Sequence, residues 1–124
     1  MAPRSLLIIE DDAEFRAIVV RLFERRGYHV VACDCLDGAL NAAREHRLDA
    51  VLMDRTLAGR DSLRLAPQLK QLHPEIQLVV LSGHSDRSSV DEAFAAGVFD
   101  YLTKPCSLAD MERAIHRACP AIAD

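Results

Sequence analysis

The feature that most constrains this chain is the alternation, five times over, of a short aliphatic run with a segment of helical period. The candidate strands lie at residues 5–9, 29–33, 50–53, 77–81 and 99–103. Most are continuous apolar runs, which is typical of parallel strands covered by helices on both faces. Strand–helix units joined by short links predict an α/β fold with a doubly wound parallel sheet.

The helical segments carry recognisable start signals. The first has apolar residues at i, i+3, i+4, i+7 and i+8 counted from Phe15, with Asp12 as its expected N-cap, and Ser107 is the expected cap of the last helix. The third segment contains Pro67, which has no amide hydrogen to donate. We therefore expect that helix to begin near residues 63–65, with the proline in its first turn, or to be kinked.

Composition narrows the class of protein. The 124 residues are 50% hydrophobic and 27% charged, which suits one domain with a single core, and the formal charge of −4 predicts no direct binding to nucleic acid or an anionic membrane. No apolar run approaches the ~18 residues of a membrane span, and residues 1–5 are too short for a signal peptide, so we expect a cytoplasmic protein. The four cysteines form no CxxC pair and are interpreted as reduced thiols.

Polar, chemically capable residues follow four of the predicted strands. They are Glu10, Asp11 and Asp12 after the first strand, Asp54 after the third, Ser82 after the fourth and Lys104 after the fifth. A single aspartate after a strand is often only a helix cap, and Asp12 is interpreted as one. Because the carboxyl ends of parallel strands meet at one edge of the sheet, the remaining residues predict a site there.

The charges of this predicted site are unbalanced. Glu10, Asp11 and Asp54 would face only Lys104, and each pair of carboxylates about 4 Å apart costs roughly 4 kcal/mol at an effective dielectric of 20. Either one acid stays protonated or a cation lies among them. Oxygen-only ligands favour Mg²⁺, with Mn²⁺ as a substitute. With the ion bound, one carboxylate could attack a phosphoryl group while Lys104 and Ser82 hold the phosphoryl oxygens.

Four motifs give the chain a resemblance to a known family: Leu7-Ile-Ile-Glu-Asp-Asp12, Met53-Asp-Arg-Thr-Leu57, Val80-Leu-Ser-Gly83 and Ala96-Gly-Val-Phe-Asp-Tyr-Leu-Thr-Lys-Pro105. In this order and spacing they resemble the receiver (REC) domains of bacterial two-component response regulators. The resemblance covers residues 6 to about 118. It implies a flavodoxin-like (βα)5 fold with a five-stranded parallel sheet of order 2-1-3-4-5, and a single receiver domain over residues 1–124 with its core at about 5–118.

The resemblance also implies roles for individual residues. Asp54 would accept a phosphoryl group from a sensor histidine kinase or a histidine phosphotransfer protein. Asp11, Asp54 and the backbone carbonyl of Thr56 would coordinate Mg²⁺, with Glu10 reaching the ion through water.

Three further roles concern the switch that phosphorylation would operate. Lys104 would pair with the Asp54 carboxylate and later with the phosphoryl group. Ser82 would be the switch hydroxyl, and Tyr101 the aromatic residue that turns inward. The domain would thus be a regulatory switch with slow self-dephosphorylation rather than an enzyme with a metabolic substrate. Its output surface would be the face of the fourth helix, fifth strand and fifth helix, which would bind a downstream effector protein or domain or a second copy of the chain as a homodimer.

Some positions depart from the family pattern or flank its site. Ala58 stands where proline is usual, Ser62 where glycine is usual, and Cys106 where a bulky residue is common. These departures put in doubt the stiffness of the loop over residues 57–62 and the packing of the last helix. Arg55 and His84 flank the site, and we hypothesise that His84 influences hydrolysis of the aspartyl phosphate.

Two rival interpretations stay open at the level of sequence. An aspartate-nucleophile phosphatase would need a second acid two residues after its nucleophile, and that position is Thr56. A phosphorylation-independent, receiver-like interaction module would not need the full set of site residues. Residues 119–124 leave no room for an output domain, so the protein is either a stand-alone receiver or a portion of a longer regulator, and its kinase, stimulus and target stay unnamed.

Overall fold

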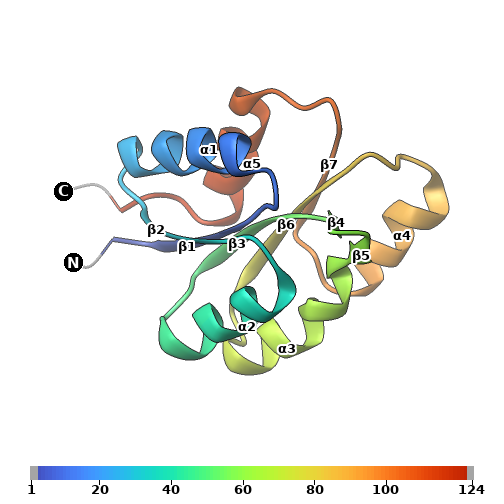
Figure 1. Cartoon of the computed structure of the whole chain (residues 1–124), viewed down its shortest axis with the longest axis horizontal. Helices are drawn as coiled ribbons and strands as arrows, with labels where there is room; N and C mark the ends of the chain where they lie inside the picture. Colours follow the sequence, from blue (N-terminus) through green and yellow to red (C-terminus); the bar gives the residue numbers. More distant parts are fainter. Residues whose placement is uncertain (1–2, 123–124) are drawn as a thin grey trace.

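A parallel sheet of five strands forms the middle layer of the protein (Figure 1). The computed structural model describes residues 3–122. The strands of the sheet are β1 (Ser5–Ile9), β2 (His29–Cys33), β3 (Ala50–Asp54), β6 (Gln77–Ser82) and β7 (Asp100–Thr103), in the order β2-β1-β3-β6-β7. Since β6 and β7 are the fourth and fifth strands of this sheet, the order is the expected 2-1-3-4-5 and the fold is flavodoxin-like.

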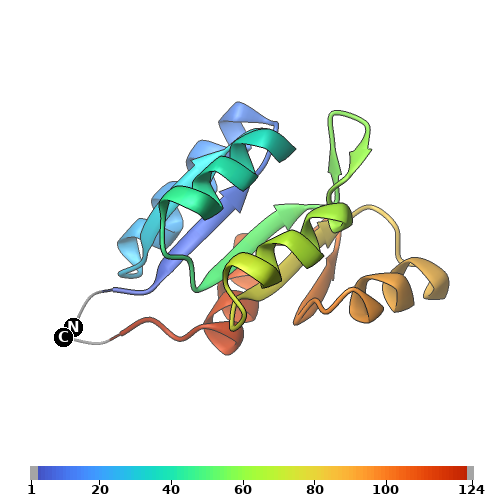
Figure 2. The ribbon, with the colours of Figure 1, turned by 90° about the horizontal axis from the view of Figure 1, so that it is seen from below.

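Helices cover both faces of the sheet (Figures 1 and 2). Helices α1 (Ala13–Arg25) and α5 (Leu108–Ala118) pack on one face, and α2 (Leu36–Glu45), α3 (Ala66–Leu72) and α4 (Arg87–Ala95) lie on the other. Alternate residues of each strand enter different cores: Leu6 and Ile8 pack with α1 and α5, whereas Leu7 and Ile9 pack with α2 and α3. This two-sided burial explains why the three central strands, β1, β3 and β6, are mostly apolar.

The local signals for helix ends are confirmed. The Asp12 side chain accepts hydrogen bonds from the amides of Glu14 and Phe15 at the start of α1, and Ser107 forms a capping box with Asp110 at the start of α5. Pro67 lies in the first turn of α3, as expected. A 3₁₀ turn, η1 (Ser62–Leu65), precedes α3, so the helical segment begins within a residue of the predicted position.

Some strand ends and one hairpin differ from the sequence-based expectations. Strand β7 begins at Asp100, one residue later than predicted, and β3 and β6 each end one residue later than predicted, at Asp54 and Ser82. A small antiparallel hairpin of β4 (Thr56–Leu57) and β5 (Arg60–Asp61), which periodicity did not predict, follows β3. Its turn places Ala58 and Gly59 at φ angles of 49° and 79°. Within residues 3–122, no helix is long and apolar enough to cross a membrane.

The strand register brings the polar strand ends to one edge of the sheet. Ile9 pairs with Met53, Asp54 with Leu81 and Ser82 with Thr103. The residues that follow these pairs therefore emerge side by side.

Candidate functional site

Three carboxylates meet at the carboxyl edge of the sheet. Glu10 and Asp11 follow β1, and Asp54 is the last residue of β3. One carboxylate oxygen from each lies within 4.8 Å of the other two. The convergence expected from the strand ends is therefore present.

Asp54 is held on both of its carboxylate oxygens. Lys104, which follows β7, donates from Nζ to Oδ2 at 2.5 Å, and the Thr56 amide donates to Oδ1 at 3.1 Å. The Asp54 side chain is 8% exposed, whereas that of Lys104 is 41% exposed. A buried carboxylate is thus fixed in direction by one charged and one neutral donor, while the ammonium group stays open to solvent.

Glu10 is the acid in this group whose charge is least favoured. Burial raises its pKa to about 7, and the nearby Asp54 carboxylate adds to this, although the Asp12 amide and Lys104 act in the opposite direction. That amide donates to Glu10 Oε1 at 3.0 Å, and Arg16 donates to the Glu10 backbone carbonyl at 2.7 Å. Without a cation, the acid group therefore relieves its repulsion by keeping a proton on Glu10 for part of the time at neutral pH.

Asp11, the next residue, differs from Glu10 in both exposure and pKa. It is exposed, and the amide of Ala58 at the tip of the β4–β5 hairpin donates to its Oδ2 at 3.0 Å. This hydrogen bond lowers the pKa of Asp11. The hairpin thus orients an ionised carboxylate toward Asp54.

The donor set of these three acids fits a hard divalent cation. Their oxygens are close together, two of the acids are buried, and within residues 3–122 the one ion pair to these acids is that of Lys104 with Asp54. Such an oxygen-rich, cation-poor arrangement favours a hard divalent cation over zinc. Thr56, the other expected ligand, is the first residue of β4, directly after Arg55.

The two expected switch residues are connected through the backbone of His84. Ser82 is buried, and its Oγ accepts a hydrogen bond from the His84 amide at 3.0 Å. The Tyr101 hydroxyl donates to the His84 carbonyl at 2.5 Å. His84 itself is exposed, so its expected effect on hydrolysis stays a prediction, as does the movement of Ser82 and Tyr101.

Arg55 and Ser62, beside the phosphoacceptor candidate, form contacts that sequence reasoning did not predict. Arg55 is buried and its side chain reaches toward α4, and Ser62 is fully buried with its hydroxyl donating to the Asp54 carbonyl at 2.7 Å. The only signals in the sequence were a charged residue directly after a buried strand and a hydroxyl where the family usually has glycine.

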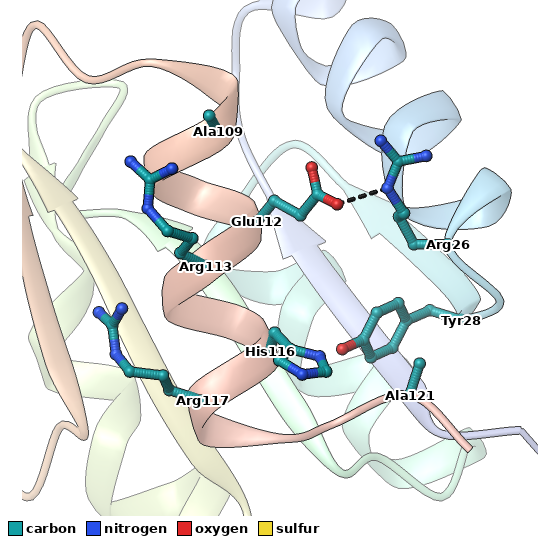
Figure 3. Close-up of a pocket in the computed structure, with 8 residues that line it drawn as sticks. All are labelled: Arg26, Tyr28, Ala109, Glu112, Arg113, His116, Arg117 and Ala121. Atoms are coloured by element: carbon teal, nitrogen blue, oxygen red, sulfur yellow. Dashed lines mark hydrogen bonds and ion pairs between the residues drawn. The ribbon is translucent and has the colours of Figure 1, made fainter. Parts of the chain in front are cut away.

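Among the hollows lined in part by α5, one adjoins the crevice and a larger one lies away from it. A hollow of about 290 Å³ is lined by Glu10, Phe15, Lys104 and Met111, among others. The second, of about 670 Å³, lies between the end of α1 and α5, as Figure 3 shows. Its arginines already have partners: Arg26 pairs with Glu112, Arg113 with Asp110 and Arg117 with Asp100. The candidate site is therefore the group of acids and Lys104 at the carboxyl ends of the strands, and not the larger hollow.

Comparison with known proteins identifies one family. The model of the response regulator receiver domain matches residues 6–116. Among curated proteins, PfeR of Pseudomonas aeruginosa is 38% identical over 113 residues, or 90% of this chain. PdtaR of Mycobacterium tuberculosis is 36% identical over 120 residues, or 94% of this chain. These two are transcriptional regulators by name. The chain spans 36% of the length of PfeR and 57% of the length of PdtaR.

A solved structure adds a chemical parallel. It is a response regulator protein from Burkholderia pseudomallei with a phosphorylated aspartic acid, a calcium ion and citrate. That protein is 29% identical to this chain, and the two superpose with a TM-score of 0.82 over 90% of this chain and 65% of that one. A receiver domain from Clostridium thermocellum, 25% identical, gives a TM-score of 0.83 over 93% of both chains.

Proposed function

Because the chain belongs to the response regulator receiver domains, which act as phosphorylation switches in two-component signalling, we propose that Asp54 is its phosphoacceptor. The observation that carries this proposal is the pairing of buried Asp54 with Lys104 at 2.5 Å, beside two further carboxylates. The aspartyl phosphate of the Burkholderia pseudomallei structure supports the same chemistry. We further infer that the chain is one receiver domain, with its core at residues 5–118.

The proposed reaction moves a phosphoryl group from a phosphohistidine to the Asp54 carboxylate. An Asp54 oxygen forms the new P–O bond as the P–N bond to the imidazole breaks, and the imidazole leaves with that electron pair. Lys104 and Ser82 then hold the phosphoryl oxygens, Lys104 by charge and Ser82 through its hydroxyl proton. Lys104 Nζ is already in contact with Asp54, so it needs little movement to follow the new negative charge.

A divalent cation belongs to this proposal. Glu10, Asp11 and Asp54 supply a fitting set of oxygen ligands, and we propose Mg²⁺ as the ion, with Mn²⁺ as a substitute. Asp11, Asp54 and the Thr56 carbonyl would coordinate it, with Glu10 acting through water. When bound, the ion offsets the repulsion between the carboxylates and the incoming phosphoryl group.

The role is regulatory rather than that of a dedicated enzyme. We propose that phosphorylation draws in Ser82 and Tyr101 and changes the face formed by α4, β7 and α5. The partners would be a sensor histidine kinase or histidine phosphotransfer protein upstream, and an effector protein or domain downstream, with a homodimer through the same face as a further possibility for this surface. Direct binding to nucleic acid by this chain is not part of the proposal, and a cytoplasmic location stays a prediction from sequence.

Acetyl phosphate with Mg²⁺ tests the assignment. Intact mass spectrometry should show a gain of about 80 Da, one phosphoryl group, in the native protein and none in Asp54→Asn. Asp12→Asn is the matched control, because it changes a neighbouring carboxylate whose side chain caps α1, and it should still gain the mass. An adduct that persists in Asp54→Asn would refute the assignment, and no adduct at all would favour a phosphorylation-independent interaction module.

A further inference from the structure

Arg55, the residue directly after Asp54, forms an unusually complete set of contacts for a charged residue next to a β-strand. Its side chain is 9% exposed. Nη1 donates to the Ser89 backbone carbonyl at 2.8 Å and Nη2 donates to Glu92 Oε1 at 2.8 Å, and both acceptors belong to α4. Longer contacts of 3.4 Å join the same guanidinium group to Asp61 on β5. One side chain therefore bridges the end of β3, the hairpin and α4.

The backbone of Arg55 is fixed as firmly as its side chain. Its amide donates to the Leu81 carbonyl on β6 at 2.8 Å, and its carbonyl accepts from the Ser62 amide at 2.6 Å. Movement at the end of β3 can therefore reach the hairpin through Arg55, in parallel with the Ser62 hydroxyl that donates to the Asp54 carbonyl. The guanidinium group is the part that extends this connection to α4.

Helix α4 has little else to hold it on the sheet. Ala93 is its one buried residue, whereas α1 buries Val19 and Phe23 and α5 buries three residues. The large apolar side chain of α4, Phe94, is 46% exposed. A helix with so small an apolar contact depends more on polar attachments than its neighbours do, and it opens more easily when they are lost.

We propose that Arg55 is a positioning residue that couples the phosphoacceptor strand to α4, so that a change at Asp54 reaches α4 through its guanidinium group. This inference rests on the proposed phosphorylation of Asp54. The guanidinium group suits the role because its planar fork serves acceptors on two different elements at once, which a lysine ammonium on a flexible stem does not reproduce.

These contacts also explain how the positively charged guanidinium group of Arg55 can be buried. Burial alone would lower the pKa of Arg55, but the neighbouring Tyr101 hydroxyl and Asp61 carboxylate outweigh it and raise the pKa. The Tyr101 hydroxyl donates to the His84 carbonyl in the segment that leads into α4. Arg55 thus lies among the residues through which the switch is expected to act, and its guanidinium group pairs with Glu92 and Asp61, which lie outside the acid cluster of the crevice.

The test compares Arg55→Gln with Arg87→Gln. Arg87 is the matched control, because it forms an exposed ion pair with Asp91 on the same helix. In the unphosphorylated protein, Arg55→Gln should raise hydrogen exchange of the α4 amides at least about tenfold while the β1 and β3 amides stay protected. Arg87→Gln should leave α4 exchange within about twofold of the native protein, since exposed ion pairs contribute little.

The coupling itself is read from amide chemical shifts after treatment with acetyl phosphate and Mg²⁺. In Arg55→Gln, the shift changes at residues 54–58 should remain, while those over residues 87–95 should fall below about half of the native change. Arg55→Lys keeps the charge without the fork and should restore the α4 response only partly, which also covers the case in which Arg55→Gln does not fold.

Three results would overturn the inference, and they are distinguishable. A native-like α4 response in Arg55→Gln or a complete one in Arg55→Lys contradicts the coupling. A uniform rise in exchange over sheet and helices assigns Arg55 a general role in stability instead. Absence of a mass gain in the native protein removes the proposed function, and the inference with it.

Discussion

At the scale of single residues, the crevice gives consecutive carboxylates different properties. Glu10 is 5% exposed and Asp11 is exposed, and only Asp11 receives the amide of Ala58 from the hairpin. The pKa of Glu10 is accordingly raised and that of Asp11 lowered. The sequence places both acids after β1 but does not predict that their pKa values differ. The difference arises from the burial of Glu10 and from the Ala58 amide, a hydrogen-bond donor 47 positions away from Asp11.

The raised pKa of Glu10 predicts a specific pH dependence of stability. Between its ordinary pKa of 4.5 and its folded value of about 7, the folded state holds a proton that the unfolded state releases. The free energy of unfolding of the metal-free protein should therefore fall as the pH rises from about 4.5 to 7, by up to ~3 kcal/mol from this group. Urea unfolding in EDTA at intervals across this range measures the change.

The control is Glu10→Gln, which keeps the shape of the side chain and removes its titration. Its unfolding free energy should vary much less with pH across the same range. The lowered pKa values of Asp11, Asp86 and Asp110 start from 3.8 and affect stability at more acidic pH, below this window. An equal slope in the native protein and in Glu10→Gln would contradict the assignment to Glu10.

At the scale of elements, the β4–β5 hairpin holds the mouth of the crevice. Its tip donates to Asp11, and Ser62, directly after β5, returns to the Asp54 carbonyl through a fully buried hydroxyl at 2.7 Å. The family pattern has proline at position 58 and glycine at position 62, and their replacement put the stiffness of this loop in doubt. Antiparallel pairing and the Ser62 hydrogen bonds close the loop by another route.

Removal of the Ser62 hydroxyl should loosen this closure. Ser62→Ala loses one buried hydrogen bond and is expected to lower the free energy of unfolding by about 1–2 kcal/mol in urea titrations. Ser88→Ala, an exposed serine on α4, is the control and should change it by less than about 0.5 kcal/mol. Equal stability of Ser62→Ala and the native protein would show that the hydroxyl does not hold the loop.

The elements that the sequence predicted are those with strong local signals. Apolar runs marked the five strands of the sheet, and Asp12 and Ser107 marked helix starts because their side chains satisfy amides within the same turn. The hairpin had no such signal: its strands have two residues each, and alanine at a positive φ is disfavoured by its residue type.

The same distinction applies to the site. The meeting of Glu10, Asp11, Asp54 and Lys104 could be predicted because parallel strands bring their carboxyl ends together. The bridge from Arg55 to Glu92 could not, because it depends on how α4 lies over the sheet. Nothing local in the chain sets that placement, since α4 buries only Ala93.

At the scale of the whole molecule, one face of the sheet is more firmly covered at its β7 edge than the other. Helix α5 buries Met111, Ala114 and Ile115, whereas α4 on the opposite face buries one alanine. The acids of the crevice lie at the carboxyl edge of the sheet, between these two layers. A change of charge at this edge therefore acts on α5, which is firmly packed, and on α4, which is loosely packed. We expect α4 to be the helix that moves.

The charge imbalance at this edge also predicts how the protein as a whole responds to a divalent cation. The unfolded chain cannot hold Glu10, Asp11 and Asp54 within 4.8 Å of one another, so Mg²⁺ should bind the folded state preferentially and raise its unfolding free energy. At a concentration about one hundred times the dissociation constant, the gain is about 2.7 kcal/mol. Urea unfolding at pH 7.5 with MgCl₂, against NaCl of equal ionic strength, separates specific binding from screening.

Variants show whether the gain comes from the crevice. Asp11→Asn removes one of the three clustered carboxylates and should abolish most of the stabilisation by Mg²⁺, whereas Asp37→Asn on α2 removes an equal charge elsewhere and should leave it intact. Protons compete with the ion for Glu10, so the stabilisation should also be smaller at pH 5 than at pH 7.5. If Mg²⁺ stabilised native protein and Asp11→Asn equally, the ion would be bound elsewhere and the three carboxylates would need another way to offset their repulsion.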